Sequence, residues 1–472
     1  MIDNNLLNSL DHLGVKNIDE LIEIFRPFAC NTILIKKLAK NNNDKNQVYI
    51  HSNPDFLNGL FDLTFGHREP STSKKKLGTG LPIPEGVFNE FYWLDTEHKQ
   101  HKVPSCKAIF YAQYPEVRLS GFKTESGTIP ASMSVNFTND YPGYTRFLAL
   151  GGDREGKTYA VMVVEPNSKF LKDFEELGYH PDSKACKVIR VATAETASEQ
   201  LKTLLRERIG GKSIKGCRLS SQGVTLPFNG TQVHGYTLEH ELGIATNASK
   251  EGDIFGIELK CFTNKKLTLF TPEPDGGLYA ESFDQFMRKY GYTKEAVYRF
   301  TGLHRVGTQS ERSGLSLRVL CSKKGKADNQ LVDYDPSKKF KDQLQNLQVV
   351  LMDDDDNTAA SWSLTRLLGN WGIKHNEVVY VPATVRDNEI REEVEQGYKK
   401  RVYFDDEVLW FKGSSIEQMI LAIVNGIIFL DPAPKLDLDN PKNNKRRSQW
   451  RLNNIYRDSK QLYRSIDIVS IK

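Results

Sequence analysis

Two carboxylates and one lysine lie close together in the segment from residue 251 to 260, whose sequence is Glu-Gly-Asp-Ile-Phe-Gly-Ile-Glu-Leu-Lys. Side chains alternate between the two faces of a strand, so Glu258 and Lys260 project together while the apolar residues beside them point into a core. Asp253 lies just upstream, at the start of the strand or in the preceding bend. Asp253 and Glu258 can therefore hold a hard divalent cation through oxygen atoms, with Lys260 beside an attacked phosphate.

These residue types match the needs of phosphodiester hydrolysis. The reaction requires a water made more acidic by a metal ion, an oriented scissile phosphate, and positive charge that stabilises the transition state. The spacing alone is weak evidence, because Glu97-His98-Lys99 repeats it without apolar alternation and without an acidic partner at the same distance. The motif becomes informative only together with the residues around it.

Length and composition describe an ordinary soluble globular protein of more than one domain. The chain has 472 residues, of which 39% are hydrophobic and 26% are charged. A chain of this length exceeds what one hydrophobic core usually organises. The net charge is only +4, so affinity for a polyanion would depend on local basic patches.

Cysteine usage and hydropathy indicate the compartment. The cysteines are spread along the chain without a Cys-x-x-Cys pair, which favours neither a zinc site nor a disulfide framework. The N-terminus lacks a basic region followed by an apolar core, and the longest late apolar run is interrupted by Asn425 and Gly426. We predict no signal peptide and no membrane span, and we expect a cytoplasmic location.

Short alternating segments separated by turn residues predict a β-rich first half. The clearest strands are expected at residues 107–112, 116–120, 146–150 and 159–164. A helix is expected from Ala194 to Ile209, where apolar residues form one stripe that Gly210-Gly211 ends. We place the domain boundary after that glycine pair, with an N-terminal domain over residues 1–211 and a second domain over residues 212–472.

The second half has the pattern of an α/β domain. Thr237 is a suitable N-cap for a helix that carries Glu239. The strand with the acids and the lysine follows, and further strands are expected at residues 267–270 and 314–319. Apolar residues spaced between positions 362 and 371 predict a helix packed on the sheet.

Three other motifs indicate no function. Gly210-Gly211-Lys212-Ser213 lacks the first glycine of a phosphate-binding loop, and it follows a predicted helix where such a loop follows a strand. His240-Glu241 begins like a zinc-protease helix, but Ile244 occupies the place of the second histidine. The acidic run Asp353–Asp356 is typical of a solvated turn.

Several ordered motifs resemble the catalytic core of the MvaI/BcnI family of restriction endonucleases, which is related to the mismatch-repair nickase MutH and has the PD-(D/E)xK fold. The motifs are Gly235-Tyr-Thr-Leu-Glu239, Leu242-Gly-Ile244, Asp253, Gly256-Ile-Glu-Leu-Lys260 and Leu267-Thr-Leu-Phe-Thr-Pro-Glu-Pro274. The resemblance covers the chain from Ser213 to Lys472. It implies an α/β (α+β) restriction-endonuclease-like catalytic domain with a mixed sheet, preceded by a β-rich α+β N-terminal domain.

The resemblance implies Mg²⁺-dependent hydrolysis of duplex DNA, with Mn²⁺ able to substitute. Asp253 and Glu258 correspond to metal ligands, and Lys260 to the lysine that assists the attacking water. Glu239 corresponds to the family's helical glutamate near the metal, and a helix-surface acid is the alternative. The usual Pro-Asp is Gly252-Asp253 here, which alters the turn and not the ligand.

Basic residues near the C-terminus correspond in position to the family's loop that reaches into DNA. Arginine can hold a guanine edge through two hydrogen bonds, and lysine mostly holds phosphates. A solvated basic turn is the alternative. The predicted DNA contacts of this segment are Lys442, Lys445, Arg446, Arg447 and Arg451. Further candidates, each with a plain surface position as the alternative, are His304, Arg305 and Lys374.

The N-terminal half resembles the accessory region of longer family members, through residues 42–49 and 114–122. This resemblance implies no defined activity. The region could read additional bases, bind a second DNA copy that activates cleavage, sense base modification, or serve as a scaffold without DNA contact.

Taken together, the sequence predicts a type II site-specific deoxyribonuclease of a restriction-modification or related defence system. We expect a monomer that cleaves both strands of DNA and leaves 5′-phosphates. The alternatives are a MutH-like enzyme that nicks one strand and a DNA-binding or regulatory protein that does not cleave. The recognised bases cannot be derived from the sequence.

Overall fold

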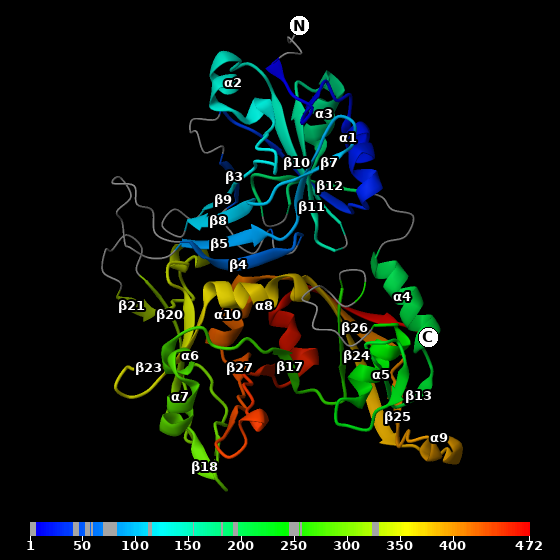
Figure 1. Ribbon diagram of the computed structural model, residues 1–472, viewed down its shortest axis with the longest axis vertical. Coiled ribbons are helices and arrows are strands. Elements are labelled where there is room, and N and C mark those ends of the chain that lie inside the picture. The colour runs from blue at the N-terminus through cyan, green and yellow to red at the C-terminus, as the bar shows by residue number, and fades with distance from the viewer. Residues whose placement is uncertain are drawn as a thin grey trace. The chain divides into compact units, whose positions relative to one another are not determined.

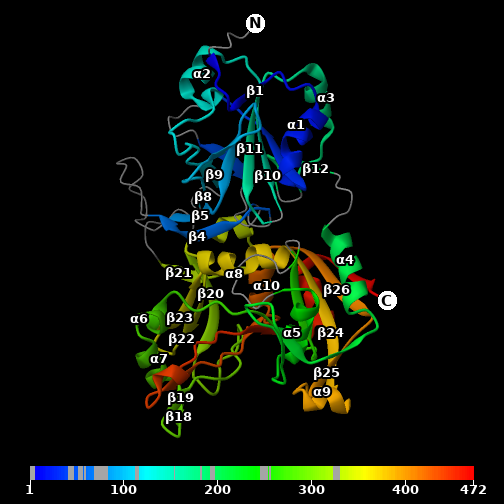
Figure 2. The ribbon, with the colours of Figure 1, turned by 45° about the vertical axis from the view of Figure 1, so that its right-hand side comes forward.

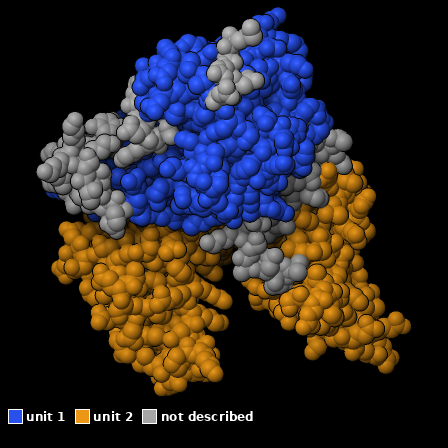
Figure 3. Space-filling model, turned by 45° about the horizontal axis from the view of Figure 1, so that its top comes forward, with its two compact units in different colours: residues 1–193, 321–347 blue, residues 194–320, 348–472 orange. Residues whose placement is uncertain are grey.

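The structure is a computed structural model. It describes residues 6–40, 47–51, 57, 60–68, 83–111, 116–153, 155–180, 183–191, 197–244, 254, 257–322 and 330–472. The chain forms two compact units, which are residues 1–193 with 321–347 (unit 1) and residues 194–320 with 348–472 (unit 2) (Figure 3). The domain boundary expected after Gly211 stays a prediction.

Unit 1 is built on a mixed sheet that two helices cover. The strand order is β12 (Lys187–Arg190), β2 (Thr32–Lys37), β10 (Arg146–Gly152), β11 (Thr158–Val164), β6 (Phe91–Leu94) and β7 (Gln100–Lys102), and β1 (Asp11–Leu13) pairs with β11. The helices α1 (Ile18–Phe25) and α3 (Ser168–Glu176) pack apolar side chains against the central strands. The strands predicted at 146–150 and 159–164 are confirmed as β10 and β11.

A second, antiparallel sheet completes the β-rich part of unit 1. Its strand order is β3 (Val48–His51), β9 (Glu116–Ser120), β8 (Lys107–Tyr111), β5 (Ile83–Phe88) and β4 (Leu63–Arg68). The short helix α2 (Val135–Asp140) follows. The strands predicted near 107–112 and 116–120 are confirmed, and the β-rich character of the N-terminal half with them.

Unit 2 is organised by the long strand β24 (Glu377–Asp387). One sheet has the order β13 (Ser213–Lys215), β25 (Lys400–Phe404), β24, β26 (Glu407–Ser414) and β30 (Tyr463–Ser470), in which neighbours are antiparallel. Strand β16 (Glu258–Phe262) pairs with β24 in parallel. The sheet is therefore mixed, as predicted.

Two groups of helices pack on this sheet. The helices α4 (Ala197–Arg208) and α5 (Val233–Glu241) share an apolar core with Val379 and Val381 of β24. The helices α8 (Leu364–Asn376) and α10 (Ile416–Val424) pack on each other, and α8 also packs on β24 and β26. Both of the helices predicted at residues 194–209 and within 362–371 are present, with different bounds.

Two predicted helix starts are wrong. Helix α5 begins at Val233, and Thr237 is a buried mid-helix residue whose Oγ1 accepts from the Cys217 N–H at 3.2 Å, so its hydroxyl serves packing and not capping. Trp362 lies on strand β23 (Thr358–Ser363), where its Nε1–H donates to the Pro272 carbonyl at 2.8 Å. Helix α8 begins after Ser363, whose side chain accepts from the Arg366 N–H.

The remaining elements of unit 2 form small sheets and short helices. The sheets are β14 (Cys217–Leu219) with β15 (Thr225–Pro227), β17 (Leu267–Phe270) with β29 (Trp450–Leu452) and β27 (Phe429–Leu430), β18 (Tyr292–Lys294) with β19 (Val297–Arg299) and β28 (Lys435–Asp437), and β20 (Ser316–Ser322) with β22 (Gln348–Met352) and β23. The helices are α6 (Gly277–Glu281), α7 (Phe283–Tyr290), α9 (Arg391–Glu395) and α11 (Ile455–Asp458). The strands predicted at 267–270 and 314–319 correspond to β17 and β20.

Unit 2 has two arms. In Figures 1 and 2, α5, β24, β25 and α9 lie in one arm, and α6, α7 and β18 lie in the other, with α8 and α10 between them. The space-filling view shows unit 2 hollowed between the arms (Figure 3). Within the described residues, every helix is too short or too polar to span a membrane.

Candidate active site on strand β16

Strand β16 is placed by its parallel pairing with β24. Glu258 pairs with Val378, and Lys260 pairs with Tyr380. Ile257 is buried, and Leu259 packs against the core that α4 and α5 share with the sheet. Because neighbouring residues of a strand face opposite sides, Glu258 and Lys260 project away from that core.

Glu258 and Lys260 form an ion pair. The Lys260 Nζ donates to the Glu258 Oε1 at 2.8 Å. The Glu258 side chain is 6% exposed and the Lys260 side chain is 21% exposed, so the carboxylate is held inside the protein while the ammonium reaches its edge. The expectation that these two side chains share one face is confirmed by this contact, and their catalytic roles stay predictions.

A buried polar chain lies beside this pair. The Tyr380 and Tyr463 hydroxyls are 3.4 Å apart, and the Tyr463 Oη is 2.9 Å from the His375 Nδ1. All three residues are buried, and the His375 ring stacks on Trp371 at 4.0 Å between ring centroids. This chain is not evident from the sequence, since its members are distant in sequence and Tyr380 is surrounded by valines that indicate only an apolar strand.

A pocket of about 320 Å³ opens at the end of β16. Lys260 lines it, together with the turn that joins β16 to β17 and with His234 of α5. Burial lowers the pKa of His234 below its usual value, so the ring is neutral near pH 7. His234 lies one residue upstream of the motif that begins at Gly235, and nothing in the sequence distinguished it from a core histidine.

Two further residues are predicted to be catalytic, Glu239 and Asp253. Glu239 lies on α5, which packs against β16, and its side chain is half-buried. Asp253 lies outside the described residues. The donor chemistry fits a hard divalent cation, because the Glu258 carboxylate offers oxygen atoms of the kind that such ions prefer.

The basic C-terminal loop, residues 442–451, contains some side chains that are exposed and others that contact groups within the protein. Lys442, Lys445, Arg446 and Arg447 are exposed. The Arg446 guanidinium lies over the ring of Phe283, 4.6 Å from its centroid, and 5.7 Å from that of Tyr279, which places the loop on the arm that carries α6 and α7. These side chains are accessible to solvent, and their contact with DNA stays a prediction.

Arg451 differs from the other arginines of the loop. It lies on β29 and donates from Nη1 to the Asp431 Oδ2 at 2.9 Å, an oxygen that also accepts from Lys266 at 2.9 Å. Its side chain is 26% exposed. The structure therefore gives Arg451 a partner within the protein.

His304 and Arg305 are also engaged within the protein. His304 is fully buried, and its Nε2 is 2.7 Å from the Ser313 Oγ. Arg305 donates to the Gly426 carbonyl at 2.5 Å and lies over the Phe429 ring. A groove contact by His304 is incompatible with this burial, so that prediction is wrong. Lys374 is on α8, but its side chain lies outside the described part of the chain.

The acidic run Asp353–Asp356 forms a turn between β22 and β23. The Asp353 carboxylate accepts from Lys289 Nζ at 3.0 Å and from the Tyr290 hydroxyl at 2.8 Å, and the next three acids are exposed. The interpretation of this run as a turn is confirmed.

Comparison with known proteins identifies the family. Residues 212–463 match the sequence profile of the MvaI/BcnI restriction endonuclease family. A structure titled "Restriction endonuclease MvaI-cognate DNA substrate complex" is 17% identical, with a TM-score of 0.42 over 60% of this chain and 100% of that chain. A structure of MvaI in the absence of DNA is 14% identical, with a TM-score of 0.32 over 59% of this chain and 100% of that chain. No curated protein matches. Because the profile match spans more than half of the 472 residues, the chain belongs to the MvaI/BcnI restriction endonuclease family, which are hydrolases that act on DNA.

Proposed function

We propose that this protein is a sequence-specific, divalent-metal-dependent endonuclease that cleaves both strands of DNA and leaves 5′-phosphates, as part of a restriction-modification or related defence system. The observation that carries the proposal is the Glu258–Lys260 ion pair on an edge strand that lines an open pocket. The parallel pairing of β16 with β24, covered by helices, supports the assignment of a PD-(D/E)xK nuclease core.

Glu258 and Asp253 would hold the metal ion, for which Mg²⁺ is the expected species and Mn²⁺ a substitute. A bound divalent ion lowers the pKa of a water and draws charge from the phosphate oxygens. Lys260 places a positive charge at the pocket, where it can orient the attacking water and stabilise the negative charge that develops on phosphorus-bound oxygens. Glu239 lies on α5, which packs against β16, and is proposed to assist the metal site.

The DNA duplex is proposed to lie in the hollow between the arms of unit 2. One arm carries β16, and the other carries the exposed basic loop with Arg446 and Arg447. The phosphate backbone supplies much of the affinity of such proteins, and arginine contacts to base edges supply specificity. Lys442 and Lys445 are assigned to phosphates, and Arg446 and Arg447 to base edges.

Cleavage of unmethylated plasmid and genomic DNA tests this function. We expect Mg²⁺-dependent products with discrete ends, and no products in EDTA. Lys260→Ala and Glu258→Gln are expected to lower the cleavage rate at least about 100-fold while DNA binding in Ca²⁺ is retained. Lys338→Ala, which removes a lysine that is 67% exposed in unit 1, is the matched control and should cleave normally.

The plasmid products also separate the alternatives. Linear product indicates a double-strand endonuclease, and nicked circles that never become linear indicate a strand-nicking enzyme. Binding without any cut in Mg²⁺ or Mn²⁺ would contradict the nuclease proposal, and full activity of Lys260→Ala would contradict the assigned site.

A further inference from the structure

Three side chains of metal-binding type converge away from the proposed active site. They are Cys217 on β14 and His240 and Glu241 in the last turn of α5, and one ligand atom from each lies within 4.8 Å of the other two. Cysteine, histidine and glutamate are the ligand types that bind zinc in proteins. We propose that this cluster binds a zinc ion that fixes α5 to the β14–β15 hairpin.

The helix repeat explains why the three residues meet. Thr237 contacts β14 directly, because its Oγ1 accepts from the Cys217 N–H at 3.2 Å and donates to the Cys217 carbonyl at 3.3 Å. Residues three and four positions later lie on the same helix face. His240 and Glu241 are these residues, so packing of Thr237 on β14 brings both over Cys217.

The histidine has the support that metal ligands usually have. The His240 Nε2 is 2.8 Å from the Thr225 Oγ1 on β15. A partner on one ring nitrogen fixes the ring and leaves the other nitrogen as the ligand. The other nitrogen, Nδ1, is 2.9 Å from the Glu241 Oε1, and a zinc ion bound by both atoms would replace the proton of this hydrogen bond.

Burial and access also fit a zinc site with three protein ligands and a water. Cys217 is 1% exposed, and the His240 and Glu241 side chains are 20% and 22% exposed. Burial raises the pKa of the Cys217 thiol to about 12, so it would become a thiolate only on binding the ion. This buried sulfur and two partly exposed ligands leave a position for a fourth ligand from solvent. The position at the C-terminal end of α5 favours a cation, since the helix dipole is negative there.

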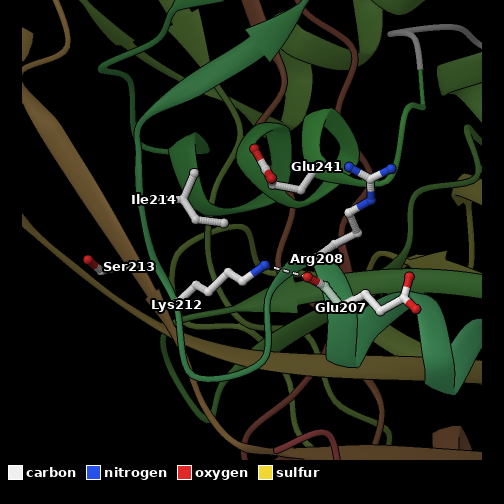
Figure 4. Close-up of a pocket in the computed structure, with 6 residues that line it drawn as sticks. All are labelled: Glu207, Arg208, Lys212, Ser213, Ile214 and Glu241. Carbon is white, nitrogen blue, oxygen red and sulfur yellow. Dashed lines mark hydrogen bonds between the residues drawn. The ribbon is translucent and has the colours of Figure 1, made fainter.

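Glu241 connects the cluster to an open pocket of about 520 Å³. Figure 4 shows Glu241 projecting from α5 in this pocket, together with Arg208 and Lys212. The Lys212 ammonium donates to the Glu207 carbonyl, and the Glu207 side chain adds a negative charge to the lining. The cationic and acidic side chains of this lining are balanced, and Glu241 is the member of the cluster that lines it.

The functional consequence concerns α5 itself. This helix carries His234, which lines the pocket beside Lys260, and Glu239. A zinc ion at its last turn would hold the helix in register with β14 and so position these side chains at the proposed nuclease site. The sequence favours no zinc site, because the three ligands come from separate elements and have no characteristic spacing.

Cobalt titration of the purified full-length protein tests the site without reference to cleavage. Metal-stripped protein titrated with Co²⁺ is expected to develop visible bands of tetrahedral cobalt and a thiolate-to-cobalt charge-transfer band, and Zn²⁺ should displace both. Cys217→Ser should abolish the charge-transfer band. Cys261→Ser, which removes another unit 2 thiol, is the control and should keep it.

A second variant covers the case in which Cys217→Ser fails to fold. His240→Gln changes a partly exposed side chain and should weaken Co²⁺ affinity about 10–100-fold and remove the rise in Tm that Zn²⁺ gives to the unchanged protein. A charge-transfer band that never forms, or one that Cys217→Ser retains, would overturn the proposal. Since neither readout uses DNA, failure here is distinguishable from failure of the proposed nuclease function.

Discussion

Lys260 and Tyr380 occupy paired positions on the parallel strands β16 and β24. The Tyr380 hydroxyl continues to Tyr463 and then to His375, so a buried hydrogen-bonded chain lies beside the Glu258–Lys260 pair. Burial raises the pKa of Tyr380 to about 12, which keeps its hydroxyl protonated at neutral pH. The Tyr380 hydroxyl therefore adds no charge beside the ion pair.

Tyr463→Phe should lower the free energy of unfolding clearly and the rate of DNA cleavage only slightly. The substitution removes the contacts of the hydroxyl with His375 and Tyr380 and leaves buried polar groups without them, at a cost of about 1–3 kcal/mol in the free energy of unfolding. Urea denaturation measures this loss. The exposed Tyr456 gives the matched control, Tyr456→Phe, which should unfold as the unchanged protein does. Equal stability of the two variants would show that the buried chain contributes little.

Arg446→Ala should relax sequence discrimination. The guanidinium lies over the rings of Phe283 and Tyr279, which limits its motion and suits it to hold one base edge. Loss of such a contact costs about 1–3 kcal/mol of discrimination at one base pair. Cleavage of a library of single-base variants of the target measures this change. Arg391→Ala, whose side chain is 90% exposed on α9, should leave discrimination intact, and identical profiles for the two variants would contradict the assignment.

Arg451→Ala should lower the free energy of unfolding and leave sequence discrimination unchanged. Arg451 and Lys266 share the Asp431 Oδ2, so removal of Arg451 deletes a partly buried charged hydrogen bond worth about 1.5–3 kcal/mol. Denaturation and the same target library separate the two effects. A change in the preferred bases without a change in stability would instead support a DNA contact by Arg451.

The contrast between Arg446 and Arg451 shows where the sequence stops being informative. Both belong to one basic run, but β29 begins at Trp450 and directs Arg451 toward Asp431. The fold around Glu258 and Lys260 was predictable, because strand alternation fixes which side chains share a face. Pairing partners distant in sequence were not, and these include Tyr380, Tyr463 and the partners of Cys217.

Helix α5 shows a second limit of prediction from the sequence alone. Thr237 is a good N-cap by residue type, yet the helix begins at Val233 and buries Thr237 against β14. Tertiary packing therefore overrides a local preference. His304 shows a third limit, since a glycine-flanked His-Arg pair is typical of a surface loop, while its backbone pairs with Leu430 and its ring stacks on Phe300.

His234→Ala should slow cleavage without reducing stability. The ring lines the pocket beside Lys260, and its Nδ1 is buried without a hydrogen-bond partner among the described residues, so folding loses little when it is removed. Because burial lowers its pKa, the ring is neutral above about pH 6.5, and we expect the neutral form to contact the substrate. Single-turnover rates across pH 5 to 8 should show an acidic fall in the unchanged protein that His234→Ala lacks. His67→Ala, at an exposed position in unit 1, is the control, and an unaltered profile in His234→Ala would contradict a role in cleavage.

His304 should make the stability of the protein pH-dependent. Burial lowers its pKa from 6.5 to about 4, so the unfolded chain binds a proton at a higher pH than the folded chain does. The free energy of unfolding is therefore unaffected by His304 above about pH 6.5, falls as the pH drops, and stops falling below about pH 4, for a total loss of about 3 kcal/mol. At pH 5 the loss should be about 2 kcal/mol.

His304→Gln isolates this contribution from other acid-sensitive groups. Glutamine can still bond to Ser313, the partner of His304 at 2.7 Å, but it does not titrate. Urea unfolding of both proteins at pH 7.5 and pH 5 should show a smaller acid-induced loss for His304→Gln, by about 2 kcal/mol. Equal losses would mean that His304 is protonated at the same pH in the folded and unfolded chains. The complete burial of His304 opposes this outcome, because a charged imidazolium in that position would lack the solvent that stabilises it.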